Sequence, residues 1–170
     1  MLIETHRLEI IVLIAAQLHL LANDIAALEA DLECTYKGEP LMGRFLDAIR
    51  LQANKSAEDE LNLAFHSFWL MIRKQDRTAI GMAGFKGPPG DEREVEIGYG
   101  IGEQHRGNGF MAEAVRAICA WALEQRTVDR VIAETETNNT PSERVLELCG
   151  FVKYKTMAES AWWELCTAAR

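Results

Sequence analysis

Residues 104–110, Gln-His-Arg-Gly-Asn-Gly-Phe, join an expected strand at residues 93–101 to an expected helix at residues 110–124. The first amide groups of a helix have no partner within the helix, and the helix dipole places partial positive charge there. Glycines beside a helix start let the backbone approach an anion closely. The stretch therefore predicts a phosphate site, although the glycines alone also allow a tight turn without a ligand.

Two common nucleotide-binding motifs do not fit these glycines. A dinucleotide-binding fingerprint needs G-x-G-x-x-G at the first strand-to-helix turn of a βαβ unit. Here an expected hairpin and a third strand precede residues 104–110, and the glycines have other spacings. A Walker loop is excluded because no G-K-[ST] follows. The phosphate is therefore expected to belong to another class of ligand.

Around this stretch, hydrophobic periodicity predicts one mixed α/β domain that includes residues 1–170. The order is a strand, helices, three strands, a helix, a strand, a helix and two strands. The strands are expected at residues 5–13, 65–73, 79–86, 93–101, 130–137, 151–157 and 161–167, and the helices at 15–22, 24–32, 40–51, 110–124 and 140–149. Residues 54–59 are expected to form a polar loop, and Thr140 is expected to cap the last helix ahead of Pro141.

Composition argues against several classes of function. The formal net charge is −8, and a negative surface would repel the backbone of a nucleic acid. Such a surface either attracts cationic partners such as amines or serves solubility alone. The charged start is unlike a signal peptide and no apolar run is long enough to cross a bilayer, so a cytoplasmic location is expected. The scattered cysteines and separated histidines predict neither disulfides nor a metal site.

Several motifs in consistent order resemble the GNAT superfamily of N-acetyltransferases, in particular its RimJ/RimL-like branch. Gln104-x-x-Gly107-x-Gly109 matches the Q/R-x-x-G-x-G/A signature. Residues 4–8 (ETHRL) resemble the E-T-x-R-L start of the branch, and residues 96–101 (EIGYGI) resemble its E-I-G-Y-x-I strand. Residues 111–114 (MAEA) resemble its helix start, and residues 138–151 resemble its N…S…G-F block.

The resemblance implies a GNAT fold, with a central, mostly antiparallel, twisted sheet of about seven strands, flanked by helices, in which one pair of strands is splayed. It also implies acetyl-CoA as the co-substrate. The diphosphate would lie on the amides of residues 106–110, and a bulge in the strand 93–101 would open a slot for the pantetheine arm. His105 and Arg106 either add charge near the phosphates or lie solvated in the loop. The donor-binding residues implied are Ile101, whose amide region would stabilise the thioester oxygen, Gln104, His105, Arg106, Gly107, Asn108, Gly109, Phe110, Asn138 and Ser142.

Acetyl transfer needs a neutral amine, and an alkyl ammonium has a pKa of about 10, so a base must take a proton. Glu96 is the expected base or substrate anchor, because strand alternation places it on the polar face toward the glycine-lined cleft. An exposed residue that aids solubility is the alternative. Many members of the family use a tyrosine as general acid five residues ahead of the final Phe, where this chain has Leu146. Ser142 is expected to contact the sulfur or the arm, with an ordinary first-turn hydroxyl as the alternative, and a thiolate also leaves without an acid.

The expected reaction is direct transfer of an acetyl group from acetyl-CoA to a primary amine. Residues 24–59 would shape the acceptor side, and their mixed acidic and apolar composition permits a protein N-terminus, a polyamine or a small amine. The alternatives are a non-catalytic acyl-CoA-binding regulator of the same fold, which the missing tyrosine favours, and a nucleotide-dependent oxidoreductase. Neither nucleic acid nor membrane is expected as a partner.

Three further features stay open at the level of sequence. Glu134 and Glu136 share one face of their strand, where they either meet a cationic acceptor or lie exposed. Trp162 and Trp163 point to opposite faces, so that one of them lines the acceptor pocket or both are structural. Residues 161–167 either complete the domain's own sheet or pair across a homodimer, as family habit suggests.

Overall fold

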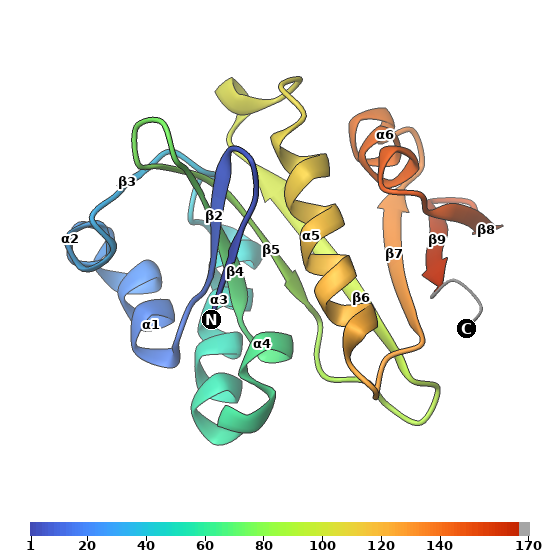
Figure 1. Ribbon diagram of the computed structural model, residues 1–170, viewed down its shortest axis with the longest axis horizontal. Helices are drawn as coiled ribbons and strands as arrows, with labels where there is room; N and C mark the ends of the chain where they lie inside the picture. The colour runs from blue at the N-terminus through green and yellow to red at the C-terminus, as the bar shows by residue number, and fades with distance from the viewer. Residues whose placement is uncertain (167–170) are drawn as a thin grey trace.

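A computed structural model describes residues 1–166 as a nine-stranded sheet with helices on both faces (Figure 1). The strand order is β1-β2-β4-β5-β6-β7-β9-β8, and β3 pairs with β5 beside this path. The pairs β3–β5 and β6–β7 are parallel, and the others are antiparallel. The strands are β1 (Leu2–Glu4), β2 (Leu8–Val12), β3 (Thr35–Tyr36), β4 (Phe68–Arg73), β5 (Thr78–Phe85), β6 (Glu94–Ile101), β7 (Arg130–Glu136), β8 (Val152–Thr156) and β9 (Ser160–Cys166). The helices are α1 (Ala15–Asn23), α2 (Ile25–Leu32), α3 (Gly43–Glu58), α4 (Leu63–His66), α5 (Phe110–Glu124) and α6 (Thr140–Leu148), with short 3-10 turns at Glu60–Asn62 and Glu103–His105.

All seven expected strands are present, and β1 and β3 are additional. β3 has two residues and β1 has three, which is too short for alternation to be visible in the sequence. Phe65 lies in α4, so the strand expected from that residue begins at Phe68. Thr167, the last residue of the expected final strand, lies outside the described residues.

The expected boundaries of two helices are wrong. α3 begins at Gly43 rather than at Pro40, and it continues to Glu58 through the expected polar loop, because its buried residues Ile49, Ala53 and Ser56 keep a helical spacing on one face. α6 begins one residue earlier than the expected cap implies, because Asn139 rather than Thr140 is the cap: its side chain accepts a hydrogen bond from the Ser142 amide.

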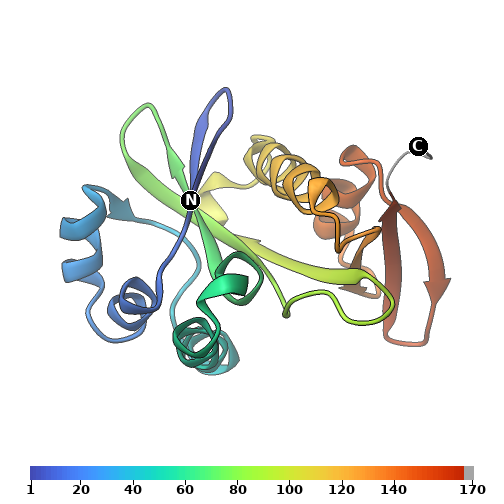
Figure 2. The ribbon, with the colours of Figure 1, turned by 60° about the horizontal axis from the view of Figure 1, so that its bottom comes forward.

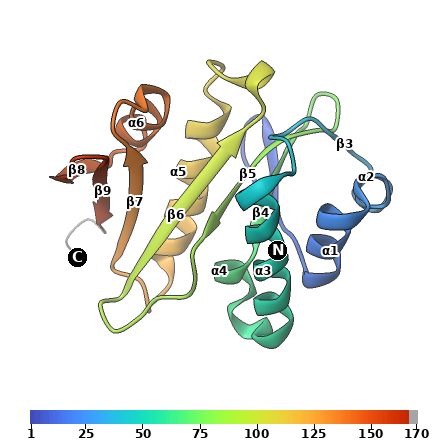
Figure 3. The ribbon, with the colours of Figure 1, turned by 180° about the vertical axis from the view of Figure 1, so that it is seen from behind.

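Two hydrophobic clusters fill the two faces of the sheet. β4 serves both, since Trp69 and Met71 pack toward α5 while Leu70 and Ile72 pack toward α1 and α3. Figure 2 shows α1–α3 on one side of the sheet and α5 on the other. Seen from the side of α3, β6 and β7 have no helix in front of them (Figure 3). The sheet is therefore covered on both faces at its centre and on one face at β6 and β7.

β6 and β7 separate along their length. They pair over three residue pairs, from Glu94–Arg130 to Glu96–Ile132, and β6 then continues to Ile101 without pairing to β7. The bulge expected in this strand is wrong, because the register between β6 and β5 is continuous over residues 97–101. The splayed pair arises where the β6–β7 ladder ends, while a register shift occurs in the β4–β5 pair instead.

Arg130 holds the three paired strands together where the ladder is intact. Its guanidinium forms ion pairs with Glu94 of β6 and, at 2.9 Å, with Glu164 of β9. β9 lies between β7 and β8 of the same chain, so the described part of the expected strand 161–167 completes the chain's own sheet. In the described part of the chain, no helix has the length and apolar character needed to span a membrane.

Candidate active site

A cavity of about 580 Å³ opens where β6 ends. Its walls come from the end of β6, the loop after it, the first turn of α5, and α6. We call it the site cavity. Seven of the residues expected to bind the donor line it, namely Ile101, His105, Arg106, Gly107, Gly109, Phe110 and Ser142.

The loop before α5 has the backbone that a phosphate site needs. Gly107 and Gly109 have φ angles of 75° and 76°, in the left-handed region that side chains with a Cβ rarely adopt. Gly109 is the N-cap of α5, and no side chain caps the helix there. The first-turn residues Phe110, Met111 and Ala112 line the site cavity. The amide-rich, electropositive end of α5 therefore borders the cavity.

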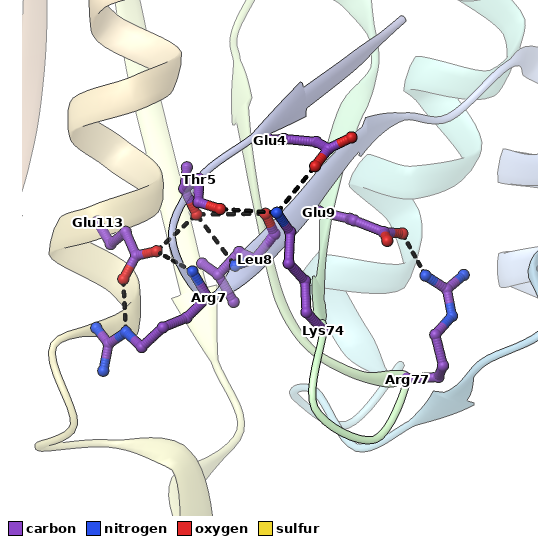
Figure 4. A network of polar contacts seen from close by, with 8 residues as sticks. All are labelled: Glu4, Thr5, Arg7, Leu8, Glu9, Lys74, Arg77 and Glu113. Atoms are coloured by element: carbon purple, nitrogen blue, oxygen red, sulfur yellow. Dashed lines mark hydrogen bonds and ion pairs between the residues drawn. The ribbon is translucent and has the colours of Figure 1, made fainter.

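Arg7, in the turn between β1 and β2, ties this loop to the N-terminal hairpin (Figure 4). Its Nη1 donates to the carbonyl oxygen of Asn108 at 2.9 Å, and its Nε donates to the Glu113 carboxylate at 2.7 Å. The Arg7 amide and the Thr5 hydroxyl donate to the same carboxylate at 2.9 and 2.6 Å. The guanidinium also lies 4.3 Å from the centre of the Phe110 ring. This network fixes the position of the loop. The sequence analysis recognised residues 4–8 as a family motif but did not assign them this role.

His105 is nearly buried at the wall of the site cavity. The residue is 8% exposed, and its Nε2 has no hydrogen-bond partner in the described structure. Burial lowers the pKa of His105, and the positive charge of Arg73 lowers it further. Arg106 and Arg144 also line the cavity. The site therefore combines a neutral imidazole with two guanidinium groups, in a chain whose net charge is −8.

The ladder between β5 and β6 determines where the Ile101 amide points. The Gly102 amide donates to Ile80, and the Lys86 amide donates to Glu96, each at 2.9 Å, so the even-numbered residues of β6 bond to β5. In an antiparallel ladder the intervening residues direct their amides to the opposite edge. The amides of Tyr99 and Ile101 therefore point toward the opening between β6 and β7. Stabilisation of a thioester oxygen there stays a prediction.

α6 forms the wall opposite the loop. Ser142 lines the cavity, and its carbonyl oxygen accepts a hydrogen bond of 3.0 Å from the hydroxyl of Tyr99. Tyr99 lines the cavity as well, and burial raises its pKa. Leu146, at the position of the family tyrosine, is fully buried in the core and does not line the cavity. Tyr99 is thus the phenol that lines this site, and the sequence analysis did not single it out.

Four of the expected site residues lie outside the lining of the site cavity. Gln104 donates to the carbonyl oxygen of Lys37 at 3.2 Å, and the Asn108 side chain donates to carbonyl oxygens within its own loop. Asn138 is exposed with a φ of 72°, and its neighbour Asn139 lines the cavity instead. Glu96 pairs with Lys86 at 2.5 Å. The roles of these four in binding and catalysis stay predictions.

Glu39 lines the site cavity, and sequence reasoning did not single it out. Residues 24–59 were expected to shape the acceptor side, and Glu39 lies within them. Its neighbours Gly38 and Pro40 indicate a turn in the chain, and neither indicates a chemical function. Because Glu39 reaches the site through the pairing of β3 with β5, no local pattern in the sequence could have identified it.

A second hollow, also of about 580 Å³, lies between the ends of β7 and β9. Glu134, Glu136 and Glu159 line it together with Trp162. Trp163 points to the other face, where it is buried and donates to the Thr135 hydroxyl at 3.1 Å. No group of three potential metal ligands gathers anywhere in residues 1–166.

Comparison with known proteins finds relatives that are named as N-acetyltransferases. Over 95 residues the chain is 34% identical to the uncharacterized N-acetyltransferase YjdG of Bacillus subtilis (strain 168), which covers 56% of each chain. It is 28% identical over 137 residues to the uncharacterized N-acetyltransferase p20 of Bacillus licheniformis, which covers 74% of each. The match thus spans little more than half the length of the first relative.

A solved structure resembles the whole chain in fold. RimL, described as a ribosomal alpha-N-protein acetyltransferase in complex with coenzyme A, superposes with a TM-score of 0.68 over 98% of both chains, at 14% sequence identity. The family model for the acetyltransferase (GNAT) domain matches residues 19–152, which include both walls of the site cavity. This chain therefore belongs to the GNAT acetyltransferase domain family.

Proposed function

We propose that this chain is an N-acetyltransferase that moves an acetyl group from acetyl-CoA to a primary amine by direct transfer. One observation carries the proposal: a single cavity joins the uncapped start of α5 to the edge of β6 that faces the opening toward β7. A ligand with a diphosphate at one end and a reactive acyl group at the other fits such a path. Acetyl-CoA has this form.

The donor would be held mainly by the backbone. The diphosphate would lie on the amides of residues 106–110, where the helix dipole and Arg106 favour negative charge. Arg144, on the other wall, supplies a second cation. The arm would then pass Ser142 and enter the opening between the strands. Asn138 and Gln104 keep their expected supporting roles as part of the proposal.

The transfer step needs a neutral amine next to the thioester. The nitrogen attacks the carbonyl carbon, the developing oxyanion receives a hydrogen bond from the amide near Ile101, and the C–S bond breaks. Glu96 is the base expected from the sequence, and Ser142 is the residue expected near the sulfur. The Tyr99 hydroxyl lies beside Ser142 on the same wall.

The acceptor class is a primary amine, with a protein N-terminus, a polyamine and a small amine as its members. RimL, which shares the fold, acts on a ribosomal protein by its name. At 14% identity this likeness extends to the fold alone. The acceptor must therefore be found by experiment.

Two measurements test the proposal. Acetyl-CoA should raise the melting temperature of the protein while NAD(H) does not, because the proposed ligand of the site cavity is acetyl-CoA and not a dinucleotide. Incubation with acetyl-CoA and a panel of peptides, polyamines and small amines should then release free thiol in step with acetylated product. Absence of coenzyme A binding would exclude the proposal.

A non-catalytic acyl-CoA-binding regulator is the second candidate. The observation in its favour is that Leu146 replaces the family tyrosine and is buried away from the cavity. Tight coenzyme A binding without thiol release from any amine of the panel would support this candidate against the enzyme.

A further inference from the structure

The segment that carries Glu39 is anchored across the end of β6. β3 pairs with β5, and the Lys37 amide donates to the carbonyl oxygen of Ala79 at 2.8 Å. Gln104 donates to the Lys37 carbonyl oxygen from the other side. The Tyr36 hydroxyl donates to the Glu39 carbonyl oxygen at 2.8 Å. The segment at Glu39 is therefore fixed by contacts with two separate parts of the chain and by the local contact from Tyr36.

The Glu39 carboxylate lies directly on Gly100. A Cβ added to Gly100 would lie 1.6 Å from one carboxylate oxygen and 2.9 Å from the other, so only glycine leaves room for this group. Tyr99 and Ile101 pack toward the cluster around α5, and alternation along β6 directs Gly100 to the opposite face. The site cavity therefore extends from α5 on one face of the sheet to Glu39 on the other.

The Glu39 carboxylate is available to bind a cationic ligand and to accept a proton. Among the described residues that line the cavity it is the sole carboxylate. It has no ion-pair partner within residues 1–166, whereas Glu96, on the same face of β6, is paired with Lys86. Burial raises the pKa of Glu39, and the positive charge of Arg106 partly offsets this effect. A raised pKa brings a carboxylate closer to the range in which a general base works at neutral pH.

We infer that Glu39 binds the ammonium group of the acceptor and removes its proton. The inference rests on the proposed function, which it extends by naming the group that receives the acceptor. Glu39 sits beside Gly100, next to the residue whose amide would hold the thioester oxygen. An amine hydrogen-bonded to Glu39 is therefore brought beside the carbonyl carbon that it attacks.

The step balances in protons and electrons. The ammonium gives one proton to the Glu39 carboxylate, and the nitrogen lone pair then forms the C–N bond as the C–S bond breaks. The nitrogen loses a second proton on becoming an amide, and the thiolate gains one to give free coenzyme A. Glu39 releases its proton to water, so each turnover yields one acetamide, one thiol and one proton.

The acceptor would approach from the face of the sheet that lacks helices at β6 and β7. The register between Glu96 and Ile132 places Glu134 and Glu136 on this same face of β7, across the opening from Gly100. These carboxylates create a negative potential along the approach. The acceptor class favoured by this geometry is an amine that arrives as a cation.

The test compares Glu39→Gln with Glu103→Gln, which removes one exposed carboxylate next to the loop without altering the lining of the cavity. Glu39→Gln should bind acetyl-CoA as the unchanged protein does, and near neutral pH its kcat/KM for the amine should fall by roughly 100-fold or more. Without an internal base the variant depends on amine that is already neutral. Its kcat/KM should therefore rise tenfold per pH unit toward the amine pKa of about 10, and the difference from the unchanged protein should close.

Glu39→Asp tests whether a carboxylate at this position is what matters. Its kcat/KM should be lower than that of the unchanged protein but should depend on pH in the same way, because the carboxylate base is retained and only displaced. A Glu39→Gln variant with a deficit equal at every pH, or with weakened acetyl-CoA binding, would overturn the inference. The inference would also be overturned if kcat/KM rose tenfold per pH unit in Glu96→Gln and not in Glu39→Gln. If the unchanged protein binds acetyl-CoA and acetylates no amine, the proposed function itself fails, and the inference fails with it.

Discussion

His105 shows how one residue in the loop before α5 can make stability depend on pH. Its imidazole is nearly buried, its Nε2 has no partner, and its pKa is lowered by burial and by Arg73. A histidine of this kind binds a proton more readily in the unfolded chain than in the folded one. Between its ordinary value of 6.5 and its lower folded value, each step toward acid therefore favours unfolding.

We expect the free energy of unfolding to fall as the pH drops through the ordinary value of 6.5 toward the lowered folded pKa of His105, and His105→Gln to reduce that fall. The reason is that glutamine has no proton to gain in the unfolded state. Urea denaturation at several pH values measures the effect. His19→Gln is the matched control, because His19 is exposed. Equal slopes in the protein and in both variants would contradict the prediction.

At the scale of elements, the start of α5 depends on the hairpin between β1 and β2. The Glu113 carboxylate receives hydrogen bonds from Thr5 and from two nitrogen atoms of Arg7. Burial acts to raise the pKa of Glu113, but these hydrogen bonds and the charge of Arg7 outweigh it, so the pKa is lowered. The charged form of Glu113 therefore stabilises the fold above the ordinary carboxyl range, and this contribution is lost as the pH falls through the lowered pKa.

Glu113→Gln should lower the free energy of unfolding at neutral pH by roughly 2 kcal/mol, because it weakens charge-assisted hydrogen bonds in a partly buried network. The difference from the unchanged protein should shrink below the ordinary value of pH 4.5, because there the carboxylate is protonated first in the unfolded chain and only at lower pH in the folded protein.

Denaturation by urea across this pH range measures that effect, and calorimetry should show weaker acetyl-CoA binding, since Arg7 also holds the carbonyl of Asn108. Asp47→Asn, which removes an exposed ion pair with Arg50 at 3.9 Å, is the control and should change stability by less than about 1 kcal/mol. A loss no larger than that of the control would show that the network does not support the loop.

Elements also show how far the sequence could predict this structure. The loop at residues 104–110 is local, so its glycines and the following helix were sufficient to predict it. The opening between β6 and β7 was expected, but its cause was not: a ladder that ends at Glu96 leaves no mark in the sequence. Glu39 reaches Gly100 through a two-residue strand paired with a distant one. Contacts of that kind depend on the whole fold and cannot be inferred from spacing.

At the scale of the whole molecule, the two hollows of the described structure differ in the charges that line them. The net charge is −8, yet Arg106 and Arg144 line the cavity where phosphates are proposed. Glu134 and Glu136 lie on the face from which the acceptor is proposed to come, in the hollow beside Trp162. Such a distribution would attract an anionic donor to one side of the sheet and a cationic acceptor to the other.

Removing both acidic groups, with Glu134→Gln and Glu136→Gln together, should raise the KM for a cationic acceptor by roughly tenfold at low salt, with kcat and acetyl-CoA affinity almost unchanged. The KM of the unchanged protein should rise with salt, and that of the double variant should respond less. A control that removes Glu58 and Glu60 in the same way changes the net charge equally, away from this hollow. Equal effects in both double variants would show that net charge alone is responsible.

Three residue pairs join β6 to β7, and Arg130 binds Glu94 and Glu164 at that junction. The two parts of the sheet diverge from this ion-pair cluster toward Gly100 and Ile101. We therefore expect the width of the opening to depend on these three charged side chains, which do not line the site cavity. Mutations that accumulate at this cluster during evolution would then alter the activity from a distance, while every residue around the reacting atoms stayed the same.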